Sequence, residues 1–226
     1  MASLGARIVG IDTSTEFIAR ARERTPAGAP IEYHVLDAAR REEMLSLVAN
    51  RFSKAVCTMG LMDMPEVAPL FQVLAQLVPR DGSFVFSVTH PCFHSAETQR
   101  FAEMYEEEAG RHMIRTGVKV SSYLSPSARK TEGIAGQPEP QFFFHRPLSR
   151  LFKHGFDTGF VVDGFEEPGF PPAETRKAGV KWHDMPEIPP MLVVRMRRVL
   201  RSHRRDPSAR RSSVAVRNRS RSAKPT

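Results

Sequence analysis

The first 91 residues alternate between short apolar runs and stretches in which apolar residues recur every three or four positions. The runs are short enough to be buried β-strands, and they cover residues 6–12, 31–38, 52–62 and 84–91. The stretches between them predict helices over residues 13–24, 41–49 and 65–78. This order predicts an α/β protein whose parallel strands are joined by right-handed helical crossovers.

The segment after the first apolar run carries the signals of a helix start. Thr13 or Ser14 can cap the first turn through a side-chain oxygen, and Glu16 suits the positive end of the helix dipole. Phe17 and Ile18 then begin an apolar stripe with the period of a helix.

Residues 93–145 break this alternation with polar patches and a Ser-, Pro- and Gly-rich stretch. An insertion of this length inside a domain is usually a lid, a binding loop or a disordered segment. The "YEEE" run at 105–108 is expected on a solvated helix face. Order resumes in a helix that closes at Gly155, followed by strands over residues 160–168 and 190–199.

The formal net charge of +8 is distributed unevenly along the chain. Residues 195–226 hold 12 Lys and Arg against one acid, which leaves the other 194 residues with a net charge of −3. From about residue 200 the chain is Arg- and Ser-rich with few apolar residues, a composition typical of disordered segments. We therefore expect a disordered basic tail over residues 200–226, with nucleic-acid binding limited to weak phosphate contacts of that tail.

Cys57 and Cys92 lie in apolar, strand-like contexts and are expected as free buried thiols. No metal-ligand spacing such as C-x-x-C occurs, so no metal site is predicted. No run approaches the roughly 18 consecutive apolar residues of a membrane span, so no membrane partner is expected. The start of the chain also lacks the basic-then-apolar layout of a signal peptide, which makes the cytoplasm the expected location.

Five segments together resemble the class I S-adenosylmethionine-dependent methyltransferases, in the broad type 11 branch that acts on small molecules. They are "VGIDTSTEFIARARER", "YHVLDA", "FSKAVCTMGLMDMPE", "LAQLVPRDGSFVFSVTHPCF" and "HRPLSRLFKHGFDTGFVVDGFEEP". The resemblance covers roughly residues 4–198. It implies a methyltransferase-like domain over residues 1–199, with 93–145 as its insertion or lid. It also implies a Rossmann-like fold with a mostly parallel sheet and helices on both faces.

The same resemblance implies an enzyme that uses S-adenosylmethionine as its cofactor and methylates a small molecule by in-line displacement. Alignment and desolvation supply most of the acceleration in such a reaction, so neither a catalytic triad nor a metal cluster is required.

The chain departs from this family at its start. The family's first strand and its G-x-G-x-G loop have no counterpart in the sequence, so the chain is expected to be truncated at its N-terminus and impaired in donor binding. Ser53 also stands where an Asp is common. The alternative to an enzyme is a non-catalytic remnant or binding module of the same fold. A protein directed to RNA by its basic tail is a third hypothesis.

The resemblance assigns donor-binding roles to residues at the carboxyl ends of the strands, where ligands bind in open α/β sheets. Asp12, with Thr13 beside it, corresponds to the acid that accepts hydrogen bonds from the ribose hydroxyls. Asp37 corresponds to the acid that meets the adenine amino group, and the Ala38 N–H meets a ring nitrogen. Either acid has the alternative role of a cap or solvated strand end, and the position of Asp12 also suits an NAD-binding domain.

Thr58 and Met59 correspond to the turn that lines the donor and the methyl-transfer centre, with ordinary core packing as the alternative for Met59. His90 and His94 are the candidate catalytic residues. An imidazole with a pKa of about 6.5 can take a proton from a substrate hydroxyl or amine, although a histidine bound to loop backbone fits equally well. Arg146 is a candidate clamp for an anionic substrate, with a surface ion pair as the alternative.

Overall fold

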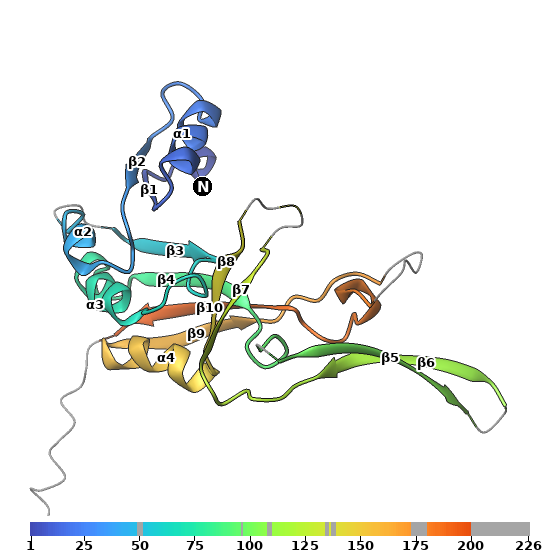
Figure 1. Ribbon diagram of the computed structural model, residues 1–226. Coiled ribbons are helices and arrows are strands. Elements are labelled where there is room, and N and C mark those ends of the chain that lie inside the picture. Colours follow the sequence, from blue (N-terminus) through green and yellow to red (C-terminus); the bar gives the residue numbers. More distant parts are fainter. Residues whose placement is uncertain are drawn as a thin grey trace, which may run out of the picture.

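The strands of the protein form four separate sheets in the computed structural model (Figure 1). The structure describes residues 1–48, 52–95, 97–107, 110–133, 136, 139–172 and 180–199. The main sheet has the order β3 (Lys54–Thr58), β4 (Ser83–Thr89), β10 (Met191–Arg198) and β9 (Phe160–Glu166). A second sheet contains only β1 (Ile8–Asp12) and β2 (Ile31–Val35).

The first four strands pair in parallel, as the sequence predicts. β1 pairs with β2, and β3 pairs with β4. β10 is antiparallel to both β4 and β9, so the main sheet is mixed. β9 and β10 follow one another in the strand order of the chain and lie side by side in opposite directions. The α/β class is confirmed, and the main sheet is mixed, with one parallel and two antiparallel pairs in place of the expected mostly parallel sheet.

The predicted helices form with slightly different ends. They are α1 (Thr15–Arg24), α2 (Arg41–Leu45), α3 (Ala68–Leu77) and α4 (Leu148–Asp157). The structure also contains two short 3₁₀ helices that were not predicted, η1 (Ala2–Leu4) and η2 (Trp182–Asp184). At the start of α1 the Phe17 N–H donates to Oγ of Ser14 at 3.2 Å, so Ser14 rather than Thr13 is the capping residue.

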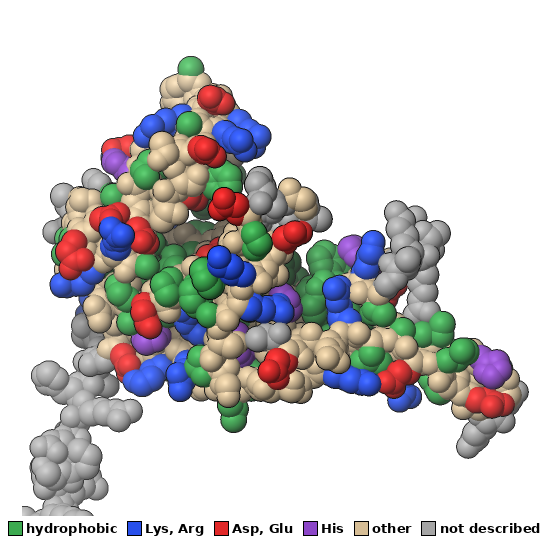
Figure 2. Space-filling model, in the orientation of Figure 1, with side chains coloured by type: hydrophobic (Ala, Val, Ile, Leu, Met, Phe, Trp, Pro, Cys, Tyr) green, Lys and Arg blue, Asp and Glu red, His purple; other side chains and the backbone are tan. Residues whose placement is uncertain are grey.

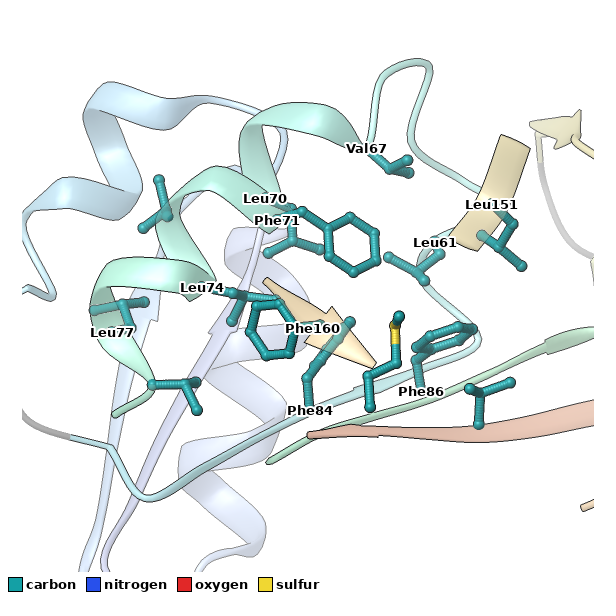
Figure 3. Packing of buried hydrophobic residues seen from close by; sticks show 14 of the residues in the cluster. Leu61, Val67, Leu70, Phe71, Leu74, Leu77, Phe84, Phe86, Leu151 and Phe160 are labelled. Atoms are coloured by element: carbon teal, nitrogen blue, oxygen red, sulfur yellow. The ribbon is translucent and has the colours of Figure 1, made fainter. Parts of the chain in front are cut away.

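The hydrophobic core lies between the main sheet and the helices α3 and α4 (Figure 3). The Phe71 ring of α3 meets the Phe84 ring of β4 edge to face, with centroids 5.6 Å apart. Gly155 lies inside α4 instead of closing it, which corrects the sequence prediction. A Cβ atom on Gly155 would lie 2.9 Å from Sδ of Met196 and 3.3 Å from Cε1 of Phe71. Glycine is therefore present because the helix packs closely on the sheet.

The insertion at 93–145 contains two antiparallel hairpins (Figure 1). They are β5 (Gln99–Glu106) with β6 (His112–Lys119), and β7 (Ser127–Thr131) with β8 (Gln141–His145). The helix predicted for "YEEE" is wrong, because Tyr105 and Glu106 belong to β5. Tyr105 is opposite Met113 and lies under the Arg115 guanidinium, whose Cζ is 4.7 Å from the ring centroid. Cross-strand partners therefore override the local charge pattern.

β1 and β3 share no backbone ladder among the described residues. Val9 and Ile11 of β1 nevertheless pack against the same hydrophobic cluster as Ala55 of β3. The side chain of Val56 in β3 is 51% exposed, a high value for an apolar residue of a parallel strand. In the space-filling view, a hollow separates the lobe of α1, β1 and β2 from the rest of this face (Figure 2).

No helix among the described residues is long and apolar enough to cross a membrane. The predicted basic tail over residues 200–226 lies outside the described residues.

Candidate functional site

The carboxyl end of β1 places Asp12 at an edge of the two-stranded sheet. The Leu36 N–H donates to the backbone oxygen of Asp12 at 3.0 Å, which holds the ends of β1 and β2 together. Oδ1 of Asp12 accepts the Ser14 N–H at 2.8 Å, so the side chain is fixed by the first turn of α1. The other carboxylate oxygen makes no hydrogen bond with a described residue and remains an open acceptor. The exposed side chain of Thr13 lies beside it.

The segment after β2 brings the second predicted acid to the same edge. Oδ1 of Asp37 accepts the Ala39 N–H at 2.8 Å, and Oδ2 lies 3.5 Å from Nε of Arg40. The Ala38 N–H, between them, has no hydrogen-bond partner among the described residues. The structure therefore combines an open acceptor at Asp12 with an open backbone donor at Ala38.

The turn after β3 holds Thr58 and Met59 on the main sheet. Met59 has a φ of 55°, a left-handed conformation that costs a non-glycine residue roughly 1–2 kcal/mol. Its N–H donates to the Ser87 backbone oxygen at 3.0 Å, which keeps the turn tight against β4. Residues held in such conformations concentrate at ligand-binding sites. Thr58 and Met59 lie on the main sheet, whereas Asp12 and Asp37 lie at the ends of β1 and β2, so the structure divides the donor candidates between two separate sheets.

His90 is 2% exposed, and both of its ring nitrogens are engaged. The Cys92 N–H lies 3.2 Å from Nδ1, and because a backbone N–H can only donate, Nδ1 is the acceptor and the proton sits on Nε2. The Nε2–H then donates to Oε1 of Glu167 at 2.8 Å. His90 therefore ties the end of β4 to the segment after β9 and has no ring nitrogen left for a substrate.

His94 lies in an aromatic and cationic environment close to the end of β4. Its ring centroid is 5.4 Å from that of Phe143 and 6.1 Å from that of Trp182. Nη2 of Arg129 is 3.4 Å from Nε2 of His94. Burial, together with the positive charges of Arg129 and Arg100 and with His145, lowers the pKa of His94 to about 4. His94 is therefore neutral at pH 7.

A small cavity of about 20 Å³ adjoins His94, which is room for about one water molecule. Its lining includes Met62 after the β3 turn, Thr89 and Pro91 at the end of β4, and Phe143 of β8. The cavity therefore lies between two neighbouring parallel-strand ends and the second hairpin of the insertion, at the sheet edge where ligands bind in α/β proteins.

Arg146 is neither an anion clamp nor a member of a surface ion pair. Its guanidinium is partly buried, and it donates to four backbone carbonyls, those of Leu61, Met64, Pro65 and Phe144. Burial lowers the pKa of Arg146. Because carbonyl oxygens occupy the donors, Arg146 fastens the loop between β3 and α3 to the end of β8.

Sequence reasoning missed Glu167, Phe143, Trp182 and Arg129 as neighbours of the two histidines. These residues lie 35 to 88 positions away from His94 or His90, so no local spacing connects them. One usable signal exists in the aromatic run "QFFFH", because aromatic residues are enriched in strands, and in the structure Phe143 and His145 are buried whereas Phe142 is exposed.

Comparison with known proteins gives a family match for the N-terminal part of the chain. A family model described as a methyltransferase domain matches residues 1–86. A sequence comparison with curated proteins gives no match.

Solved structures similar to the chain include several methyltransferases. An S-adenosylmethionine-dependent methyltransferase from Mesorhizobium loti is 25% identical with a TM-score of 0.58, over 84% of this chain and 80% of its own. A Listeria monocytogenes protein assigned to the same class is 21% identical with a TM-score of 0.62, over 87% and 83%. The glycopeptide N-methyltransferase MtfA, in complex with S-adenosylmethionine, is 15% identical with a TM-score of 0.51, over 87% and 79%. Residues 1–86 therefore match the methyltransferase domain family, and the chain has the fold of the S-adenosylmethionine-dependent methyltransferases.

Proposed function

We propose that the chain binds S-adenosylmethionine and transfers its methyl group to a small molecule. The observation that supports this most directly is the pair of unused polar groups at the ends of β1 and β2. Asp12 offers an open carboxylate oxygen, and Ala38 offers an unbonded N–H. A nucleoside needs an acceptor for its ribose hydroxyls and a donor for a ring nitrogen, so the residues present fit the nucleoside part of the donor.

The donor, when bound, supplies an activated methyl group that needs no further activation by the protein. The task of the chain is then to bind and align the two reactants and to exclude water. Asp12 and Ala38 would hold the nucleoside, and the Thr58–Met59 turn would line the reacting end. The two hairpins of the insertion would cover the acceptor as a lid.

Of the two histidines, His94 has the better position to contact an acceptor. His90 uses both ring nitrogens within the protein. His94 is neutral at pH 7 and adjoins the cavity at the strand ends. We assign His90 to positioning the end of β4, and His94 to orienting the acceptor.

A second candidate function is a non-catalytic binding module of the same fold. One observation favours it: β1 and β3 form no common ladder among the described residues, so the donor candidates are divided between two sheets. A nucleoside alone would then be the ligand, and its affinity would exceed that of the intact donor.

Calorimetric titration with S-adenosylmethionine tests the proposal through matched variants of Asp12. Asp12→Ala removes the open acceptor and should weaken binding about tenfold or more. Asp12→Asn keeps the bond to the Ser14 N–H but replaces the open oxygen with an amide donor, so it should weaken binding to a similar extent. Glu16→Ala, an exposed change in α1, is the control and should leave the affinity unaltered. Equal affinities in all four proteins would contradict the assignment of Asp12.

Comparing the donor with adenosine separates the two candidate functions. The enzyme requires the intact donor to bind at least as tightly as adenosine. The binding module requires the reverse.

A further inference from the structure

One ring nitrogen of His94 is buried and forms no hydrogen bond in the described part of the protein. Nδ1 of His94 is inaccessible to solvent and has no hydrogen-bond partner among the described residues. A buried donor or acceptor left in this state costs roughly 1–3 kcal/mol, so native proteins seldom keep one without a ligand or a bound water.

The contact with Arg129 decides which form of the ring is present. A guanidinium can only donate, so Nε2 of His94 is the acceptor of the 3.4 Å contact with Nη2 of Arg129. The proton of the neutral ring is then on Nδ1. The unused atom is therefore an N–H donor, and what it lacks is an acceptor.

The surroundings of this donor favour an anionic acceptor. The charged or titratable groups that act on His94 are Arg129, Arg100 and His145, and none of them is an acid. Arg100 has no carboxylate partner among the described residues, and its Cζ lies 5.9 Å from the centroid of the Trp182 ring. A carboxylate would accept the His94 N–H and also balance the positive charge of Arg100.

The same surroundings favour a planar group behind the carboxylate. The Phe143 ring is tilted by 49° against the His94 ring, and the Trp182 ring meets it edge to face at 87°. Each ring lies under a guanidinium, since Cζ of Arg129 is 5.4 Å from the Phe143 centroid and Cζ of Arg100 is 5.9 Å from the Trp182 centroid. A flat unsaturated ligand makes the same tilted and edge-to-face contacts with aromatic rings, and it can also stack on a guanidinium plane. The cavity of about 20 Å³ beside His94 and Phe143 has room for a single functional group of such a ligand.

We propose that His94, together with Arg100 and Arg129, binds an aromatic carboxylate, with the Nδ1–H of His94 donating to the carboxylate. The role of this ligand as the methyl acceptor rests on the proposed function. Its binding does not, because the site is built from residues distant from Asp12 and Ala38 and is testable without the methyl donor.

Titration of the full chain with sodium benzoate, followed by NMR of ¹⁵N-labelled histidine rings, tests the proposal. Benzoate should shift the ring nitrogens of His94 saturably, with a Kd in about the millimolar range. Benzamide keeps the shape but loses the charge, and it should bind about tenfold more weakly. His94→Phe keeps a flat ring without the donor and should lower the benzoate affinity about tenfold or more.

A second pair of variants keeps the test decisive if His94→Phe fails to fold. Arg100 is exposed, so Arg100→Gln should fold normally and weaken benzoate binding about two- to fivefold. Lys119→Gln, an exposed change on the same hairpin, is the control and should have no effect. The proposal is overturned if benzoate leaves the His94 signals unchanged, if benzamide binds equally well, or if a bound water at Nδ1 persists in saturating benzoate. Because no donor is present, failure here leaves the S-adenosylmethionine titration unaffected.

Discussion

Nε2 of His90 and Oε1 of Glu167 lie 2.8 Å apart, and this contact joins the end of β4 to the segment that follows β9. The two residues are 77 positions apart in the sequence. The side chain of His90 is almost completely buried, whereas that of Glu167 is about half exposed. The Glu167 carboxylate therefore lies between the buried imidazole and the solvent. The pair therefore holds His90, the first residue of the 90–94 turn, in place, and this turn positions His94.

Glu167→Ala should lower the free energy of unfolding by about 1–2 kcal/mol, because it leaves the buried Nε2–H of His90 without an acceptor. Urea denaturation measures the change. Glu166→Ala, an adjacent exposed change with no side-chain bond among the described residues, should stay within about 0.5 kcal/mol of the unaltered protein. Equal losses in both variants would show that the contact with His90 contributes nothing.

Arg146→Met should lower the free energy of unfolding by about 2–4 kcal/mol, because several backbone carbonyls that now accept hydrogen bonds from the guanidinium would lose their donor. Arg146→Lys should recover little, because a single ammonium cannot reproduce the planar fork of donors. The matched control is Arg150→Met on the exposed side of α4, for which thermal and urea unfolding should be nearly unchanged. A stable Arg146→Met protein would contradict the role of Arg146 as a fastener.

The lowered pKa of His94 predicts that acid destabilises the fold. The folded pKa of about 4 lies below the ordinary value of 6.5, so between these values the unfolded chain binds more protons than the folded one. The contribution of neutral His94 to the free energy of unfolding is fully present above pH 6.5 and is lost as the pH falls toward 4. It amounts to roughly 2–3 kcal/mol.

Comparing His94→Gln with the unaltered protein isolates this contribution from the carboxylates that titrate in the same range. The slope of unfolding free energy against pH, between pH 4 and 6.5, should be shallower in His94→Gln. His112→Gln changes an exposed histidine at the start of β6 and should keep the original slope. Parallel curves for all three proteins would mean that His94 is not buried in solution.

The two-stranded sheet of β1 and β2 should open more easily than the main sheet. Two strands alone are marginal, whereas β4 and β10 are each paired on both sides. We expect backbone amides of the β1–β2 ladder to exchange with solvent at least about tenfold faster than those of the β4–β10 ladder. Hydrogen exchange followed by NMR measures the ratio. S-adenosylmethionine should slow exchange in β1 and β2 in particular, and uniform exchange rates in both sheets would contradict the account.

The sequence was sufficient for the elements whose signals are local. A strand overlaps each of the apolar runs at 6–12, 31–38, 52–62 and 84–91. The sequence also limited the capping residue of α1 to Thr13 or Ser14, and the structure shows Ser14. These predictions succeed because apolar periodicity and capping chemistry act over a few residues. The predictions for Gly155 and for "YEEE" failed because contacts with distant elements decided both. The close approach of α4 to Met196 requires Gly155, and pairing with β6 makes Tyr105 part of a strand.

The candidate site divides in the same way. Asp12, Asp37 and Ala38 follow directly from strand ends, and their placement at one sheet edge needs only the parallel pairing of β1 and β2. The surroundings of His94 come from four separate parts of the chain: the 90–94 turn, β5, the β7–β8 hairpin and η2. No pattern in the sequence states that these segments meet, so the distinction between a fully bonded His90 and an incompletely bonded His94 required the structure.

Calorimetric titration of the unaltered chain with S-adenosylmethionine tests the central claim most directly. If the chain binds the methyl donor, we expect saturable one-to-one binding with a Kd below about 1 mM. S-adenosylhomocysteine, which shares the nucleoside, should compete with it. Cooperative unfolding shows that the protein used is folded. If such a protein gives no heat of binding at donor concentrations well above about 1 mM, the claim that this chain acts as a methyltransferase is contradicted.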